Sequence, residues 1–109
     1  MKLVYAIVND EDNPRLMAEL NKSGYRVTKL NSTGGFLRSG NTTLMIVVDD
    51  DKLQDVLEII RKFSSSRKAA INTNVTPAAI GGSYIPYPVE VMVGGATVFV
   101  LNVEHFEKM

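Results

Sequence analysis

Four polar residues flank a glycine-rich segment and have side chains suited to holding a nucleotide. Strand residues two apart share a face, so we expect Arg26 and Thr28 to point together at the start of this segment, and Asn41 and Thr43 to do so at its end. A guanidinium can bind a phosphate through two nitrogen atoms. Amide and hydroxyl groups can read base edges. If the two flanking runs pair as strands, these groups come together.

The segment itself, within "TKLNSTGGFLRSGNTT" at 28–43, supplies two further features. Gly34 and Gly35 free a run of backbone N–H groups, and such a run can form a concave nest that holds an anion. Phe36 follows at once and offers a face on which a base can stack, an interaction worth ~1–3 kcal/mol. Together these features predict a pocket that contacts phosphate, ribose and base.

The same residues also allow a plainer interpretation. Gly34 and Gly35 could simply turn the chain, Phe36 could pack into a core or subunit contact, and Arg26 could pair with a surface acid. The segment lacks the lysine and following Ser/Thr of a phosphate-binding P-loop, and the chain contains no G-x-G-x-x-G. These patterns leave both interpretations open.

Other reactive side chains do not form a catalytic or metal-binding set. The aspartates at 49–51 and the acidic residues at 10–12 precede expected helices, where capping is the favoured role over cation binding. His105, the only histidine, has no Cys, Ser or His partner nearby, which favours a surface or packing role. We find no paired acid and base with a nucleophile, so we expect neither an enzyme nor a metal site.

Hydrophobic periodicity predicts two strand-helix-strand halves. The first helix has Asp12 or Asn13 to cap it, Pro14 in its first turn and Gly24 at its end. The second has Leu53 and further apolar residues at i+3, i+4 and i+7. The expected elements are strands at 2–9, 25–30, 42–49 and 68–75, and helices within 10–24 and 50–63. Two such halves indicate an α+β, ferredoxin-like βαββαβ sandwich in one domain, 1–109.

The C-terminal third adds two features. Residues 88–103 form two alternating runs joined by Gly94 and Gly95, which predicts an added C-terminal β-hairpin with a tight turn. Residues 76–88 contain three prolines and two glycines, which predicts a long flexible loop. We expect 77–83 to be disordered without ligand and to shift when a neighbouring cleft fills.

Two helices can cover only one face of the expected sheet. The runs "LVYAIV" and "LMIVV" are nevertheless apolar on both faces, which predicts self-association through the uncovered face.

Composition limits the classes of partner and compartment. The 109 residues carry 12 basic and 12 acidic side chains, so nothing draws the chain to a nucleic-acid polymer or an anionic membrane. The absence of cysteine excludes disulfides and thiolate chemistry and suits a cytoplasmic location. The N-terminal apolar run is too short for a membrane helix and lacks a signal-peptide cleavage pattern.

Three long motifs, "TKLNSTGGFLRSGNTTL", "SYIPYPVEV" and "VGGATVFV", closely resemble the PII-like cyclic di-AMP receptor family of Gram-positive bacteria. The resemblance covers essentially the whole chain. It implies a ferredoxin-like homotrimer that binds the second messenger cyclic di-AMP in three clefts between neighbouring subunits. It also implies a non-enzymatic signal receptor without a cofactor. The short ligand loop at 33–41 and the long loop at 76–88 would address an unknown downstream protein.

The resemblance also implies roles for individual residues. Arg26 would face phosphate and ribose groups, and Thr28 and Asn41 would hydrogen-bond one adenine. Backbone N–H groups and apolar contact near the phosphates and bases are implied for Gly35, Phe36 and Leu37.

Phe99, in the motif "TVFV", would close the pocket from the sheet side. The chain departs from the family pattern at Gly24, where a polar side chain is common, and at Val47, where glycine is common. A contact through the Val47 backbone could persist while its side chain tightens the adenine site.

Two other functions fit parts of the sequence. A PII-type sensor of ATP or another adenine nucleotide would need a longer loop between the second and third strands and basic residues for a triphosphate. An acylphosphatase-like hydrolase shares the expected sandwich but places its phosphate loop after the first strand. Here that position reads "NDEDN", which is acidic and free of glycine.

Overall fold

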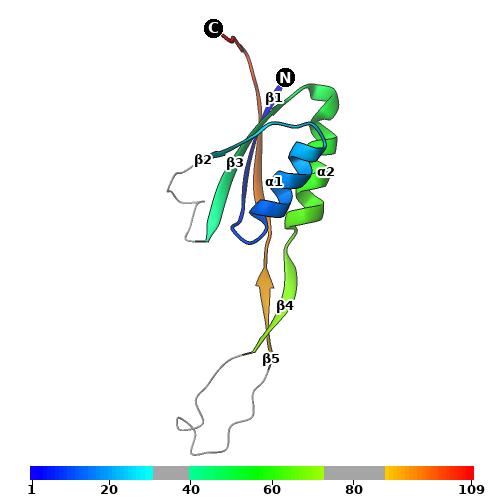
Figure 1. Ribbon diagram of the computed structural model, residues 1–109, viewed down its shortest axis with the longest axis vertical. Coiled ribbons are helices and arrows are strands. Elements are labelled where there is room, and N and C mark those ends of the chain that lie inside the picture. The colour runs from blue at the N-terminus through cyan, green and yellow to red at the C-terminus, as the bar shows by residue number, and fades with distance from the viewer. Residues whose placement is uncertain (31–39, 73–87) are drawn as a thin grey trace, which may run out of the picture.

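The computed structural model describes residues 1–30, 40–72 and 88–109 (Figure 1). Of the two predicted loops, 33–39 and 76–87 lie outside the described residues. Within them the elements are β1 Lys2–Asn9, α1 Asn13–Lys22, β2 Val27–Leu30, β3 Asn41–Val48, the 3-10 turn η1 Asp50–Lys52, α2 Leu53–Ser64, β4 Arg67–Asn72, β5 Pro88–Val93 and β6 Ala96–Asn102.

The main sheet has four strands in the order β2-β3-β1-β6, and every neighbouring pair is antiparallel. β1 and β3 pair along their whole length, from Lys2 opposite Val48 to Asn9 opposite Asn41. Both helices lie side by side on one face of this sheet (Figure 1). The result is a small α+β domain compatible with the predicted ferredoxin-like fold.

The core lies between the helices and one face of the sheet. Alternate residues of the two central strands point into it, because successive side chains of a strand point to opposite faces. The buried apolar side chains are Val4, Ala6, Val8, Leu16, Leu20, Leu44, Ile46, Val48, Val56 and Ile60.

The predicted C-terminal hairpin is wrong. β5 pairs with β4 in a separate two-stranded sheet, whereas β6 pairs with β1 in the main sheet. Gly94 and Gly95, at φ +75° and +95°, carry the chain from one sheet into the other instead of reversing it. β6 pairs with the free edge of β1 and not with β5, because this edge places it beside a strand that is already packed on the core.

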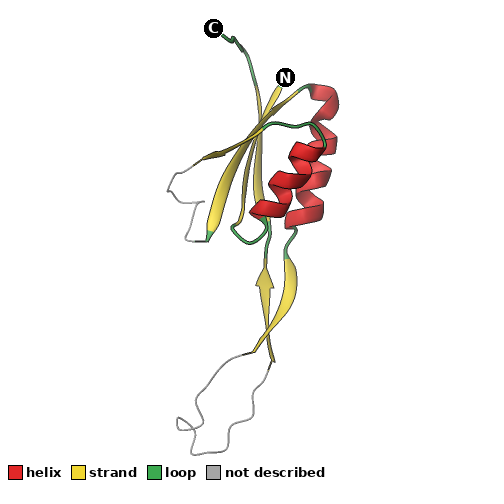
Figure 2. Ribbon diagram, viewed as in Figure 1, coloured by secondary structure: helices red, strands yellow, loops and turns green. Residues whose placement is uncertain are grey.

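This arrangement also changes the predicted role of the strand at 68–75. β4 does form there, but β6 takes the fourth place in the main sheet. β4 and β5 form a ribbon that extends beyond the ends of the helices (Figure 2). Pro88, predicted as the last loop residue, lies in β5 opposite Asn72.

The helix ends match the sequence in part. Pro14 lies in the first turn of α1, and Gly24 adopts φ +91° just after its C-cap Ser23, as expected. However, Asp12 and Asp49 stand at N-cap positions and make no side-chain capping hydrogen bond, so the capping interpretation is wrong for both. Their neighbour Asp50 instead binds the Met1 ammonium group at 2.8 Å, which lowers the pKa of Asp50.

Candidate ligand site on the open sheet face

The face of the main sheet that points away from the helices carries the candidate site. No element that the structure describes covers this face, which we call the open sheet face. Its members alternate with the core residues along each strand: Leu3, Tyr5, Ile7, Thr28, Leu30, Asn41, Thr43, Met45, Val47, Thr97, Phe99 and Leu101.

Three of the predicted site residues line one hollow. Arg26, Thr28 and Val47 surround a space of about 430 Å³ together with Met45. The rest of its lining comes from the C-terminal residues Phe106, Glu107 and Lys108. Arg26 and Thr28 are exposed, so their polar groups can reach a ligand in this hollow.

A second hollow of about 500 Å³ adjoins the first, and Arg26 and Val47 border both. Gly24 lines the second hollow, as do Asp49 and Lys52. Gly24, where the family pattern commonly has a polar side chain, therefore lies next to Arg26.

Tyr25 ties the start of β2 to α2 beside Arg26. Its hydroxyl donates to the Asp55 carboxylate at 2.5 Å, and its backbone N–H donates to the Leu20 carbonyl at 2.9 Å. The bond to Asp55 is the main reason that the pKa of Tyr25 rises to about 12, because the bond favours the protonated phenol. Sequence reasoning missed this positioning role, since Asp55 lies on an element 30 residues away.

Arg26 does not lie at the start of the glycine-rich segment, and that part of the prediction is wrong. The pairing of Thr28 with Met45 and of Leu30 with Thr43 confirms that the two flanking strands meet. Arg26 precedes β2, however, whereas the segment leaves the other end of this strand. Four residues of extended chain separate Arg26 from Leu30, about 13 Å.

Asn41 lies apart from Arg26 and Thr28. It begins β3 and lines a third hollow of about 330 Å³ beside Ile7, Gly94 and Thr97. Four residues of strand separate it from Met45, the partner of Thr28, or about 13 Å. One chain therefore does not bring Asn41 and Thr28 to the same hollow.

Phe99 lies on the open sheet face but at its opposite edge. It pairs with Tyr5, which pairs with Met45, which pairs with Thr28. Three strand spacings, about 14 Å, therefore separate Phe99 from Thr28 in one chain. Three further predicted residues, Gly35, Phe36 and Leu37, lie outside the described residues.

The turn between β1 and α1 has its backbone donors already in use. The Asp10 N–H donates to the Gly40 carbonyl at 2.8 Å, the Glu11 N–H to Asn9 Oδ1 at 2.9 Å and the Asp12 N–H to the Asn9 carbonyl at 3.0 Å. A phosphate loop at this position would need such donors for its anion. The geometry therefore argues against an acylphosphatase-like site.

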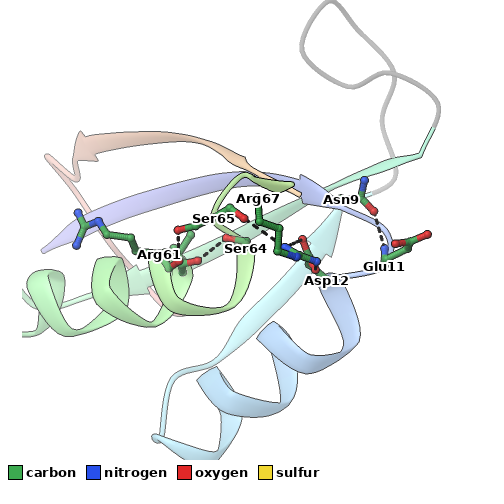
Figure 3. A network of polar contacts seen from close by, with 8 residues as sticks. Asn9, Glu11, Asp12, Arg61, Ser64, Ser65 and Arg67 are labelled. Atoms are coloured by element: carbon green, nitrogen blue, oxygen red, sulfur yellow. Dashed lines mark hydrogen bonds and ion pairs between the residues drawn. The ribbon is translucent and has the colours of Figure 1, made fainter. Parts of the chain in front are cut away.

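An ion pair that the sequence did not indicate closes this turn on its other side. The Arg67 guanidinium binds the Asp12 carboxylate, which is almost fully buried (Figure 3). The carboxylate raises the pKa of Arg67. The two residues lie 55 positions apart on elements whose contact only the folded chain defines, and no local motif signals it.

Within the described part of the chain, no group of three or more His, Cys, Asp or Glu side chains could hold a metal ion. No described helix has the length and hydropathy that a membrane crossing requires.

Two helices on one face of an antiparallel sheet, with a hollow lined by arginine and threonine on the other face, define a small α+β domain with a candidate ligand site. The family model of the cyclic-di-AMP receptors matches residues 1–109, and the chain belongs to this family. The predicted family relationship is thereby confirmed.

A solved structure is also similar, the crystal structure of a functionally unknown protein from Pediococcus pentosaceus ATCC 25745. The two sequences are 44% identical, and the match covers 99% of this chain and 96% of that chain with a TM-score of 0.77. The two proteins are therefore similar in sequence as well as in fold.

Proposed function

We propose that this protein is a non-enzymatic signal receptor that binds cyclic di-AMP in the clefts between the subunits of a homotrimer. Membership of the cyclic-di-AMP receptor family supports the ligand. The open sheet face is the structural observation that carries the placement of the site. It combines an arginine-lined hollow with apolar side chains that one chain leaves in water.

The apolar side chains of this face favour self-association. Val47, Phe99 and Leu101 are 39%, 42% and 45% exposed. Covering such side chains is favourable, at roughly 25 cal/mol per Å² of apolar surface removed from water. Further copies of the chain are the occupant proposed here, because closed symmetric assemblies bury the same face on every subunit.

Arg26 is the proposed partner of the ligand phosphates, because its guanidinium can bind them through two nitrogen atoms. Thr28 is the proposed hydrogen-bonding partner of one adenine, and Val47 forms an apolar wall of the same hollow. Cyclic di-AMP carries two adenines. Asn41, about 13 Å along β3 from the partner of Thr28, is therefore proposed to contact the second adenine.

Phe99 is proposed to come from the neighbouring subunit. Within one chain it lies at the opposite edge of the sheet from Thr28, about 14 Å away. In a ring of subunits, the β6 edge of one copy can approach the β2 edge of the next. Gly35, Phe36 and Leu37 complete the proposed site from the short loop at 33–41. That loop and the long loop at 76–88 are proposed to pass the signal to an unknown downstream protein.

A mixed-subunit experiment tests this placement. Arg26→Ala and Phe99→Ala are each expected to bind cyclic di-AMP weakly. When the two variants are unfolded, mixed and refolded together, some interfaces combine an intact Arg26 with an intact Phe99 of the neighbour. Calorimetry should then recover a fraction of sites with wild-type affinity. Recovery of no such sites, with each variant still trimeric by light scattering, would contradict a site shared between subunits.

A further inference from the structure

The turn between β1 and α1, residues 9–12, contacts two distant segments of the fold at once. On one side it meets the beginning of β3, where the chain returns from the predicted ligand loop. On the other side it meets the base of the β4–β5 ribbon, which leads to the predicted long loop. Figure 3 shows the second contact, with Asp12 and Arg67 beside Asn9 and Glu11.

The contact with the ribbon is specific in its geometry. Arg67 Nη2 donates to Asp12 Oδ1 at 2.8 Å, and Arg67 Nη1 donates to Asp12 Oδ2 at 3.3 Å and to the Ser65 carbonyl at 3.2 Å. The Asp12 side chain is 8% exposed, so it depends on this partner more than a surface carboxylate would.

Gly94 completes the base of the ribbon. A Cβ at this position would lie 2.4 Å from Arg67 Nη1 and 3.0 Å from both Asp12 Oδ2 and the Ser65 carbonyl oxygen. The backbone of the returning strand therefore packs directly against the ion pair. Both strands of the ribbon meet the turn at this one place, so Asp12 is positioned to couple the turn to the base of the ribbon.

The contact with β3 is equally direct. The Asp10 N–H donates to the Gly40 carbonyl at 2.8 Å, and the Thr42 hydroxyl donates to the Asp10 carboxylate. Thr42 is buried, so this bond gives its hydroxyl a partner where little water can reach it. The bonds of Glu11 and Asp12 to Asn9 hold the turn itself in one conformation.

We propose that residues 9–12 act as a positioning link that couples residues 40–42 to the base of the β4–β5 ribbon. A shift at Gly40 or Thr42 moves Asp10, the hydrogen-bonded turn moves as a unit, and Asp12 carries Arg67 with it. Coupling of this kind is reciprocal, so a change at Arg67 must also be felt at residues 40–42. With the proposed function, this link would carry a ligand signal from the short loop to the long one.

The link can be tested without any ligand. Thr42→Val removes the hydroxyl while keeping the shape of the side chain, and hydrogen exchange is then read at residues 67–69 and 91–93. Arg67→Ala is the reverse variant, read at residues 40–42. In each case we expect exchange at the far end to rise by about 2- to 30-fold, the range that coupled sites show. Exchange at the amides of β1 reports global unfolding, and both data sets are corrected for it.

Matched controls separate coupling from a loss of packing. Tyr25→Phe also removes a hydroxyl that donates to a carboxylate, but it lies before β2, at the other end of the sheet from residues 40–42, and Arg61→Ala removes an exposed arginine of α2 that pairs with Glu58. Neither should change exchange at residues 40–42 or at the base of the ribbon. Arg67→Lys keeps a positive charge near Asp12 and should restore part of the protection at residues 40–42 that Arg67→Ala loses.

Unchanged exchange at residues 40–42 in Arg67→Ala would overturn the link, whatever the behaviour of Thr42→Val. This variant alters an exposed side chain, so the test does not depend on Thr42→Val folding. A second arm adds cyclic di-AMP to the wild-type protein and to Thr42→Val. The link predicts a change in exchange at 67–69 in the wild type that is lost in the variant. Failure of cyclic di-AMP to bind by calorimetry would count against the proposed function, while the ligand-free result would still decide the link.

Discussion

Arg67 holds the Asp12 carboxylate through two nitrogen atoms, at 2.8 and 3.3 Å, across 55 residues of sequence. The pair joins the base of the β4–β5 ribbon to the first turn of α1. It leaves room for no side chain at Gly94, where a Cβ would lie 2.4 Å from Arg67 Nη1. Gly94, the first of the two glycines predicted to turn a hairpin, therefore serves a close approach between the backbone and the ion pair.

Gly94→Ala should lower the free energy of unfolding more than Gly40→Ala does. Both glycines have positive φ, +75° and +91°, and a left-handed conformation costs a non-glycine residue ~1–2 kcal/mol. A Cβ at Gly40 meets no atom within 4 Å, whereas at Gly94 it also collides with Arg67 and Ser65. Urea denaturation of both variants measures the difference. Equal losses of unfolding free energy in the two variants would show that the atoms around Gly94 move aside at no cost.

The Tyr25 phenol should make stability fall at high pH. Its pKa is raised to about 12 by Asp55, so the folded state favours the protonated form. Below pH 10 the phenol is protonated in both states and its contribution is complete. Between pH 10 and about 12 the unfolded phenol ionises first, and the contribution is lost as pH rises.

Absorbance titration of tyrosinate checks this pKa directly. One of the four tyrosines should ionise near pH 12 in the wild type, and Asp55→Asn should move that transition toward 10. Tyr25→Phe should remove it. A transition that stays near 12 in Asp55→Asn would show that another cause dominates.

Local pattern predicted the central strands and both helices well. The alternation in β1 and β3 and the apolar spacing of α2 arise from burial against one core, and each element carries that signal in its own residues. The partner of β6 could not be predicted in this way. Residues 96–102 alternate equally well beside β5 or β1, and only the folded chain shows which edge is free.

The candidate site was predictable in part for the same reason. Thr28 and Val47 lie on paired strands, and the register brings them to the hollow that Arg26 also lines. The positions of Asn41 and Phe99 depend on distances along and across the sheet, which residue type does not encode. The hydrogen bond between Tyr25 and Asp55 joins two segments that are distant in sequence, so no local motif indicates it.

The protein should prefer adenine to guanine. Thr28 at one adenine and Asn41 at the other can each pair with the amino donor or a ring acceptor of that base, whereas guanine would present a carbonyl oxygen and its own amino group. A mispaired buried polar group costs ~1–3 kcal/mol. Competition titrations should show cyclic di-GMP binding at least about fivefold more weakly than cyclic di-AMP. Equal affinities would defeat this assignment of the two side chains.

Val47→Gly should change the affinity for cyclic di-AMP while leaving the fold in place. Val47 is 39% exposed and borders both hollows beside Arg26, so its side chain narrows the space that glycine would leave open. Val100→Gly is the control for the loss of strand propensity, because Val100 is a similarly exposed valine (41%) whose partner Val4 points to the helix side of the sheet. An identical affinity in Val47→Gly and the wild type would place the base away from Val47.

Calorimetric titration of the wild type and Arg26→Ala with cyclic di-AMP, and of the wild type with ATP, tests the central claim most directly. Arg15→Ala, an exposed arginine of α1 on the helix side, is the matched control. We expect the wild type and Arg15→Ala to bind cyclic di-AMP equally and more tightly than ATP. Arg26→Ala should lose ~1.5–3 kcal/mol of binding free energy, the range of a charge-assisted hydrogen bond. Undiminished binding in Arg26→Ala would remove Arg26 and the hollow that it lines from the site, and tighter binding of ATP would contradict the receptor function itself.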